Sequence, residues 1–359
     1  MSELRKEGAP PTQYSLQPAQ VPELRRDNDQ GTIDNGVKIM PQRHYQYLFG
    51  PVPSRRLGRS LGVDLTPFKT CSFDCIFCQL GRTTNKTIKR QEYIPVKDVV
   101  AELDAWLKTG DRADFITLSG SGEPTLNSEF GRVIEFVRRV TTIPVALLTN
   151  GSLLSDPDVR AQAAQANVVK VSLSAWDPFS FDHINRPHAD LKFKQLIEGL
   201  WLLRNQFKGE MWMEVFLVWG TNTTTKDVSR IAEIVKAIRP DKIQLNTAVR
   251  PPCEEFAYAV PEDQMTALAK LFDPPADVIA EYSSDASAKV RANEEDILEM
   301  LERRPCTIDQ ICRVFGLHRN EASKYLGKLV RTGNAQEHRK AGEIYFSGMH
   351  GQEAPHAHA

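Results

Sequence analysis

Apolar, strand-like runs alternate with amphipathic, helix-like runs from residue 60 onward, and this alternation constrains the fold of the 359-residue chain more than any other feature. The strand-like runs cover residues 61–65, 115–119, 145–149, 168–174, 211–218 and 242–246. The helix-like runs cover residues 96–107, 129–140, 156–166, 191–207, 225–239 and 261–272. Strands that alternate with helices form a parallel sheet covered by helices, and right-handed connections let such a sheet curl into an open barrel. The sequence therefore predicts an α/β fold, a partial (β/α)6 barrel.

Three of the six cysteines lie within eight residues, in the segment Cys71-Ser-Phe-Asp-Cys75-Ile-Phe-Cys78. This segment follows the first predicted strand, so we expect it at the carboxyl edge of the sheet, where α/β barrels carry their active sites. Three thiolates hold three irons of a 4Fe-4S cluster, and the fourth iron then stays open to an outside ligand. The same cysteines also fit a structural zinc site that takes its fourth ligand from a distant histidine or cysteine. The spacing alone leaves both interpretations open.

The cysteine spacing, with the aromatic Phe77 before the last cysteine, resembles the radical S-adenosylmethionine (SAM) superfamily. The resemblance implies a six-unit partial barrel and one open iron that binds the amino and carboxylate groups of SAM. It implies that an electron from the reduced cluster cleaves SAM to methionine and a 5′-deoxyadenosyl radical, which takes a hydrogen atom from the substrate. It also implies a low-potential electron donor of the flavodoxin or ferredoxin type.

Several segments at the predicted strand ends resemble the parts of this superfamily that bind SAM. After the second strand, Gly120, Ser121, Gly122 and Glu123 resemble the Gly-Gly-Glu segment, whose backbone and acid meet the amino group of SAM. Glycines allow close backbone approach and an ammonium group needs an acceptor, although a glycine turn with an acid at a helix start has the same pattern. The further candidates for SAM binding, at the ends of the third, fourth and sixth strands, are Asn150, Ser172, Ser174 and Asn246.

Three residues near the predicted barrel mouth are candidates for catalysis. Cys253, after the sixth strand, is a candidate hydrogen-atom donor to a substrate radical, or a loop cysteine without a role. Arg186 is placed to hold a carboxylate, and Glu214 faces inward from the fifth strand, although solvation of a loop or strand end explains both equally. The basic segment with Arg55, Arg56 and Arg59 predicts either an anion site near the barrel mouth or a solvated loop.

Within the superfamily, residues 47–255 resemble the wyosine-synthase-like group in their GEPT, TNG, SLSAxD and QLNTxVRPP segments. Some of these enzymes rebuild a guanosine in tRNA beside the anticodon. Wyosine-forming enzymes carry additional cysteines upstream of the radical motif for a second cluster, whereas here no cysteine precedes Cys71. We therefore predict a single cluster.

The C-terminal pattern differs from the barrel repeat. Helix-like runs at 294–304, 308–315 and 319–332, followed by a hairpin at 335–347 turning at residues 340–342, predict a winged helix-turn-helix over 294–348. Residues 319–340 hold six bases against two acids, a balance that fits contact with nucleic acid phosphates, while such modules also dock proteins or peptides. The remaining predicted parts are an N-terminal extension (1–46), flexible or wrapping the barrel (47–275), a linker (276–293) and a disordered tail (349–359).

The overall charge and hydropathy limit the classes of function. Forty-five Lys and Arg against 46 Asp and Glu give a net charge of −1, which excludes a histone-like protein. No apolar run approaches the ~20 residues that span a bilayer, and the N-terminus lacks the apolar core of a signal peptide, so we expect a cytoplasmic protein. Two hypotheses remain: a radical SAM enzyme acting on a substrate such as RNA or a peptide, and an iron–sulfur redox sensor that binds DNA without turnover. The predicted barrel and SAM-binding segments favour the enzyme.

Overall fold

The computed structural model describes residues 33–34, 37–38, 45–54, 56–248, 252–279, 294–315, 317, 319–340 and 343–349. The chain divides into two units, Met1–His44 and Tyr45–Ala359. In the first unit, β1 (Ile33–Asp34) pairs with β2 (Val37–Lys38) in antiparallel orientation. Most of the predicted N-terminal extension, linker and tail lies outside the described residues, as do Arg55, residues 316 and 318, and residues 341 and 342 of the predicted hairpin turn.

The second unit contains a mixed sheet of eight strands in the order β12-β11-β10-β9-β8-β7-β4-β3. Six of its strands fall at the predicted positions: β4 (Gly58–Val63), β7 (Phe115–Leu118), β8 (Val145–Thr149), β9 (Val168–Ser172), β10 (Glu210–Leu217) and β11 (Lys242–Thr247). Their parallel pairing follows chain order, so each strand adds to the same growing edge, as expected for repeated strand–helix units.

Two strands of this sheet were not predicted. Strand β3 (Leu48–Ser54) runs antiparallel to β4 at one edge, and β12 (Asp277–Val278) extends the other edge beyond β11. Strand β3 is irregular, because it contains Gly50 at φ +88° and a register shift between Phe49 and Val52. Its sequence therefore does not show a regular strand pattern.

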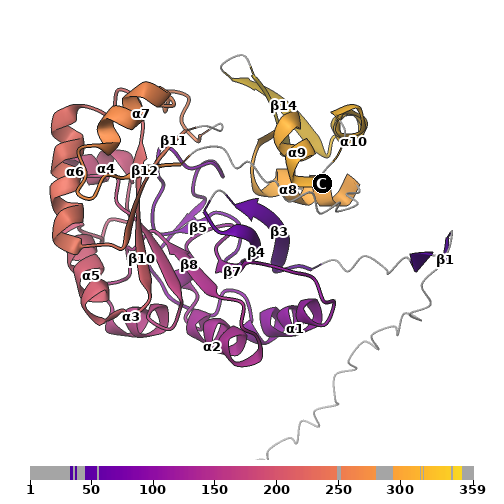
Figure 1. Cartoon of the computed structure of the whole chain (residues 1–359), viewed down its shortest axis with the longest axis horizontal. Coiled ribbons are helices and arrows are strands. Elements are labelled where there is room, and N and C mark those ends of the chain that lie inside the picture. Colours follow the sequence, from indigo (N-terminus) through magenta and orange to yellow (C-terminus); the bar gives the residue numbers. More distant parts are fainter. Residues whose placement is uncertain are drawn as a thin grey trace, which may run out of the picture. The chain divides into compact units, whose positions relative to one another are not determined.

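The predicted helices connect the strands and lie in a row on one side of the sheet (Figure 1). They are α1 (Val96–Leu107), α2 (Phe130–Val140), α3 (Pro157–Ala163), α5 (Phe193–Gln206), α6 (Thr225–Ile238) and α7 (Glu262–Ala269). Helix α4 (Pro178–Ile184) was not predicted, because its sequence contains none of the strong helix formers. It begins at Asp177, which exchanges capping hydrogen bonds with Ser180.

Successive residues of each central strand point to opposite faces of the sheet. On β9 and β10, Val169, Val171 and Met213 belong to the main hydrophobic core, which the helices share. The alternate positions Lys170 and Glu214 are buried polar residues on the other face. The face of the sheet that is turned away from the helices is therefore partly polar, and the candidate site lies toward its carboxyl edge.

The C-terminal part of the second unit has a hydrophobic core of its own, which includes Ile297, Leu301 and Leu326. Its elements are α8 (Glu294–Arg303), β13 (Cys306–Thr307), α9 (Ile308–Phe315), α10 (Arg319–Arg331), β14 (Ala335–Lys340) and β15 (Glu343–Gly348), with sheet order β13-β15-β14. The predicted capping box is present, because the backbone N–H groups of Thr307 and Gln310 each donate to the other residue's side chain. The winged-helix interpretation of this part stays a prediction.

Candidate functional site

The cysteine loop begins where β4 ends and lies against the loop that follows α4. Cys71 is the second residue of β5 (Thr70–Cys71), which pairs with β6 (Asn85–Lys86). Farther along the loop, the Asp74 amide donates to the Asn185 carbonyl at 3.0 Å. These backbone contacts fix the loop at the carboxyl ends of the parallel strands, where the sequence predicted it.

Each of the three clustered cysteine sulfurs receives a hydrogen bond from a side-chain nitrogen. Lys69 Nζ lies 3.2 Å from Cys78 Sγ, Asn185 Nδ2 lies 3.4 Å from Cys75 Sγ, and Asn150 Nδ2 lies 3.6 Å from Cys71 Sγ. The three donors come from the segment before β5, the end of α4 and the end of β8. Hydrogen bonds to thiolate sulfur are the interactions that tune iron–sulfur clusters, so this donor set fits such a cluster. Sequence reasoning missed the roles of Lys69 and Asn185, although both stand in or beside segments that it singled out.

Burial raises the pKa of Cys71 to about 12, and it raises that of Cys75 well above its ordinary value. Repulsion from neighbouring acidic groups, Glu123 for Cys71 and the other cysteines for Cys75, acts in the same direction. The two groups therefore stay protonated until a positively charged centre replaces their protons, as metal binding does. Within the described ranges, no three His, Cys, Asp or Glu side chains are grouped so that they share one metal ion. A four-iron cluster does not need such a group, because each of its cysteines binds a different iron.

The glycine segment after β7 contacts the chain itself at very short range. A Cβ on Gly122 would lie 1.8 Å from the Thr70 carbonyl oxygen, and one on Gly120, which has φ +143°, would lie 2.5 Å from Asp64 Cγ. Between them, Ser121 donates its backbone N–H and its hydroxyl to the Asp64 carboxylate. Burial raises the pKa of Asp64. The two glycines thus allow close approach within the chain itself, which fixes Thr70, the residue just before Cys71, while the predicted approach to SAM stays a prediction.

Glu123 is buried and uses its carboxylate within the chain. Oε1 accepts from the Thr125 and Thr149 hydroxyls, each at 2.6 Å, and Oε2 accepts from the Asn150 amide at 2.7 Å. Burial raises the pKa of Glu123. In this structure Glu123 thus holds the turn that carries Asn150, and Asn150 in turn donates to the sulfur of Cys71.

The candidates for SAM binding at the ends of the fourth and sixth strands differ in how far they are buried. Ser174 is buried, and its hydroxyl accepts from the Phe216 amide at 3.1 Å, so it ties β9 to β10. Ser172 is only half-buried at the end of β9. Asn246 donates to Glu214 Oε1 at 3.0 Å. Of the four strand-end candidates for SAM binding, Ser172 and Asn150 are thus the more accessible ones.

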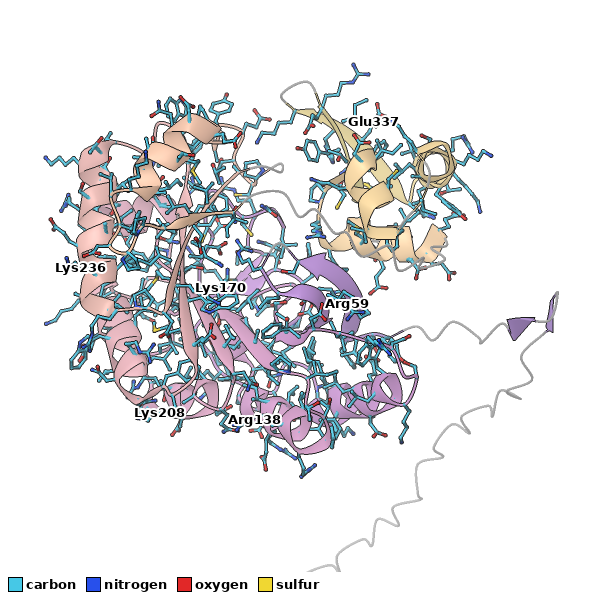
Figure 2. All side chains as sticks on the ribbon, in the orientation of Figure 1. Arg59, Arg138, Lys170, Lys208, Lys236 and Glu337 are labelled. Carbon is cyan, nitrogen blue, oxygen red and sulfur yellow. The ribbon has the colours of Figure 1, made fainter. Side chains whose placement is uncertain are left out.

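Glu214 lies in a buried charge cluster that the sequence did not predict. Arg56 and Lys170 both form ion pairs with its carboxylate. Their positive charges, together with a hydrogen bond from Asn246, outweigh the effect of burial and lower the pKa of Glu214 to about 2. Figure 2 shows Lys170 among the strands of the sheet. Glu214 is therefore ionised at neutral pH and acts as an acceptor and counter-ion.

The basic segment with Arg56 and Arg59 lies at the amino end of the parallel strands. The sequence had predicted it near the barrel mouth, at their carboxyl end. Arg59 pairs with Asp114, which directly precedes β7, and this is the amino end of the parallel strands. Arg56 lies just before β4 and reaches inward to Glu214. The expectation of an anion site near the barrel mouth was wrong for these two residues, because the short β3–β4 hairpin returns the chain to the amino edge.

The remaining candidates surround the cysteine loop. Phe77 stacks on Phe216 with ring centroids 4.1 Å apart and an interplanar angle of 11°. Arg186 forms an ion pair with Glu254. Cys253 lies beside the loop, with Sγ 3.4 Å from the Cys75 carbonyl oxygen, and burial raises its pKa to about 11. The structure thus brings Arg186 and Cys253 to the cysteine loop, of which Phe77 is itself a part, whereas Glu214 belongs to the polar face of the sheet.

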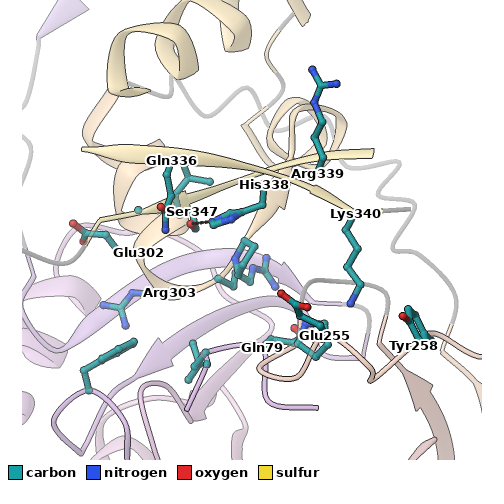
Figure 3. Close-up of a pocket in the computed structure, with 18 residues that line it drawn as sticks. Gln79, Glu255, Tyr258, Glu302, Arg303, Gln336, His338, Arg339, Lys340 and Ser347 are labelled. Carbon is teal, nitrogen blue, oxygen red and sulfur yellow. Dashed lines mark hydrogen bonds between the residues drawn. The ribbon is translucent and has the colours of Figure 1, made fainter. Parts of the chain in front are cut away.

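A cavity of about 740 Å³ opens beside this loop (Figure 3). Phe68, Gln79 and Tyr258 line one side of it, and Arg339 and Lys340 of β14 line another. Among the residues that the structure describes, the buried Lys340 Nζ has no hydrogen-bond partner, and burial lowers the pKa of Lys340. The cavity thus combines aromatic rings with cationic side chains.

Comparison with known proteins places the chain in a family. Residues 65–235 match the model of the Radical SAM superfamily. Over 308 residues the chain is 31% identical to a UPF0026 protein of Methanocaldococcus jannaschii, covering 83% of this chain and 94% of that protein. The chain belongs to the UPF0026 family. The match supports a Radical SAM domain over residues 65–235, and this superfamily implies an enzyme that uses a 4Fe-4S cluster and SAM.

Other similar proteins match this chain over different shares of their own length. A UPF0026 protein of Synechocystis is 37% identical over 57% of this chain and 76% of that protein. A protein named GTPase Obg of Brachyspira hyodysenteriae is 35% identical over 90% of this chain, which spans only 48% of that protein. Among solved structures, a radical SAM methyltransferase from Sphaerobacter thermophilus has a TM-score of 0.48 and 17% identity, covering 64% of this chain and 68% of that one. In the part of the chain that the structure describes, no helix is both long and apolar enough to cross a membrane.

Proposed function

We propose that this UPF0026 protein is a radical SAM enzyme that binds one 4Fe-4S cluster through Cys71, Cys75 and Cys78. The observation that carries the proposal is the set of three sulfurs at the carboxyl edge of a parallel sheet, each with its own N–H donor. When bound, the reduced cluster and SAM supply a 5′-deoxyadenosyl radical, with methionine as the other product, and the radical takes a hydrogen atom from the substrate.

The residues of the chain itself provide the surroundings for this chemistry. Phe77 and Phe216 are part of an apolar cluster next to the cysteine loop, which excludes water from that side. Ser172 and Asn150 offer half-buried polar groups at strand ends for SAM. We assign Arg186 and Cys253 to the substrate side of the loop, Arg186 as a carboxylate-binding group and Cys253 as a candidate hydrogen-atom donor. The electron comes from a low-potential donor of the flavodoxin or ferredoxin type.

We also propose a macromolecular substrate that the C-terminal winged helix-turn-helix presents to the barrel. The cavity beside the cysteine loop supports this, because it combines the cationic Arg339 and Lys340 with the aromatic Tyr258 and Phe68. Phosphates pair with such cations and bases stack on such rings, which favours RNA over a peptide. The resemblance to the wyosine-synthase-like group makes tRNA the first RNA to test.

The test is anaerobic reconstitution with iron and sulfide, followed by SAM and dithionite, with 5′-deoxyadenosine measured by mass spectrometry. We expect four irons per chain and 5′-deoxyadenosine in the wild type, and neither in Cys75→Ala. Cys312→Ala is the matched control, because Cys312 belongs to the C-terminal core and should leave both unchanged. A four-iron protein that never cleaves SAM would favour the redox-sensor hypothesis, and a zinc protein that takes up no iron would refute both. Turnover with tRNA, and not with peptides, supports the RNA substrate.

A further inference from the structure

Lys69 is the one cationic donor among the three that meet the cysteine sulfurs. Its Nζ lies 3.2 Å from Cys78 Sγ, whereas the sulfurs of Cys71 and Cys75 receive neutral amide N–H groups from Asn150 and Asn185. Hydrogen bonds from charged donors are roughly twice as strong as those between neutral groups. The lysine therefore makes the three sulfur positions electrostatically different.

The burial of Lys69 requires a negative partner. The residue is only 3% exposed, and lysines are almost never fully buried unless they are paired. In the described part of the chain, its Nζ forms no ion pair with a carboxylate. Asp74 lies near enough for the positive charge of Lys69 to help lower its pKa, but the Asp74 carboxylate already binds Arg82 and the Thr83 amide. The partner that Nζ meets at short range is thus the sulfur of Cys78.

The backbone at Lys69 is held in a conformation that lysine does not favour. Its φ is +57°, in the left-handed region, where a side chain costs free energy that glycine would not. Two hydrogen bonds hold it there: the Lys69 amide donates to the Ser121 carbonyl at 2.7 Å, and the Lys69 carbonyl accepts from the Asn85 amide at 3.1 Å. The glycine segment described above thus fixes Lys69 as well as Thr70. A lysine at a position where its backbone conformation costs free energy indicates that the lysine side chain has a function there.

We propose that Lys69 sets the reduction potential of the cluster by stabilising its reduced form through Cys78. This inference rests on the proposed function, because it requires the 4Fe-4S cluster. Reduction adds one electron, taken from the low-potential donor, to a cluster whose three thiolate ligands already make it anionic. A buried cation beside one thiolate stabilises the more negative state, so it makes the reduction potential less negative. Lys69 is a positioning and tuning residue, since it acts through the cluster and does not touch the substrate.

The test is an electron paramagnetic resonance redox titration of the reconstituted full-length protein, with iron content measured on the same samples. Lys69→Met keeps an unbranched side chain, one heavy atom shorter, and removes both its charge and its N–H groups. We expect the ratio of reduced to oxidised cluster at a fixed potential to fall about tenfold, which is a shift of about 59 mV for one electron. Asn185→Leu removes a neutral donor and should shift the potential in the same direction by less.

Lys86→Met is the matched control. Lys86 is the strand partner of Cys71 and is also a lysine, but its exposed Nζ binds the Arg186 carbonyl at 3.2 Å and no sulfur. Its removal should leave the potential unchanged. If Lys69→Met assembles a four-iron cluster with the wild-type potential, or if Lys86→Met shifts the potential equally, the proposal is wrong.

Two further variants decide the matter if Lys69→Met binds no cluster. Lys69→Arg and Lys69→Gln both keep a donor, but only arginine keeps the charge. Equal potentials in these two variants overturn the proposal, whereas a more negative potential in the glutamine variant supports it. A wild-type protein that takes up no iron would instead refute the proposed function, so the two failures are distinguishable.

Discussion

Replacing Glu214 by glutamine tests whether the buried charge cluster stabilises the fold. The carboxylate is only 10% exposed and pairs with Arg56 and Lys170, which are 14% and 10% exposed. The fall in the pKa of Glu214 from 4.5 to about 2 corresponds to about 3 kcal/mol in favour of the folded state with an ionised carboxylate. Removing one partner of a buried pair also costs about 3–5 kcal/mol in other proteins, because the remaining charge stays buried. We therefore expect Glu214→Gln to lower the free energy of unfolding by about 3 kcal/mol.

The assay is chemical denaturation of the purified protein, with a thermal melt expected to fall by roughly 6–12 °C for this loss. Asp104→Asn is the control, because its ion pair with Lys108 is exposed on α1 and should contribute less than about 1 kcal/mol. A loss of less than about 1 kcal/mol in Glu214→Gln would refute the argument.

The pH dependence of stability gives a second check. Because the pKa of Glu214 is lowered in the folded state, its contribution is present above about pH 4.5 and is lost as the pH falls toward about 2. That acid-dependent loss should be smaller in Glu214→Gln.

Three other substitutions test the site and its supports. Gly122→Ala places a Cβ 1.8 Å from the Thr70 carbonyl oxygen, so it should displace Cys71 and reduce the iron bound after reconstitution. Gly327→Ala is the control and should leave the bound iron unchanged, because its Cβ would meet only an arginine side chain, at 3.4 Å. Asn222→Ala removes hydrogen bonds to the Ser174 carbonyl, the Phe216 carbonyl and the Val218 amide, and should lower the free energy of unfolding by about 2–3 kcal/mol in denaturation experiments, because these buried groups lose their partners. Cys253→Ser should leave iron uptake unchanged, since Cys253 contacts the loop through the Cys75 carbonyl and not through a sulfur; loss of iron would place it among the ligands.

The strands of the barrel were predictable because most are short, continuous apolar runs that are buried almost throughout, and the helices because apolar residues recur on one side of each. The predicted range 96–107 coincides with α1, and the other ranges differ from the observed helices and strands mainly at their ends. Strand β3 was not predictable in this way, because its glycine and two prolines interrupt the apolar run and its pairing depends on β4. Helix α4 was missed because its sequence, unlike that of the equally short α3, contains no strong helix former.

The site was predictable where one short segment carries the chemistry, as with Cys71, Cys75 and Cys78. It was not predictable where the partner is distant in sequence. Arg56 and Lys170 are 158 and 44 residues away from Glu214, and nothing in the local sequence of any of the three indicates that they meet. Lys69 is only nine residues from Cys78, yet its role depends on a left-handed backbone that the glycine segment imposes.

The sequence positions of the residues that donate to the three sulfurs indicate whether the chain folds before or after it binds iron. Asn150 and Asn185 reach Cys71 and Cys75 from 79 and 110 residues away, so they meet the cysteines only after several strands have paired. The main hydrophobic core is built from apolar side chains, and Cys71 and Cys75 pack against it as partly buried residues. In a zinc finger, by contrast, the metal creates the fold. Here the chain should fold first and receive iron and sulfide afterwards, so a folded, metal-free form can accumulate when either is scarce and be activated later without new synthesis.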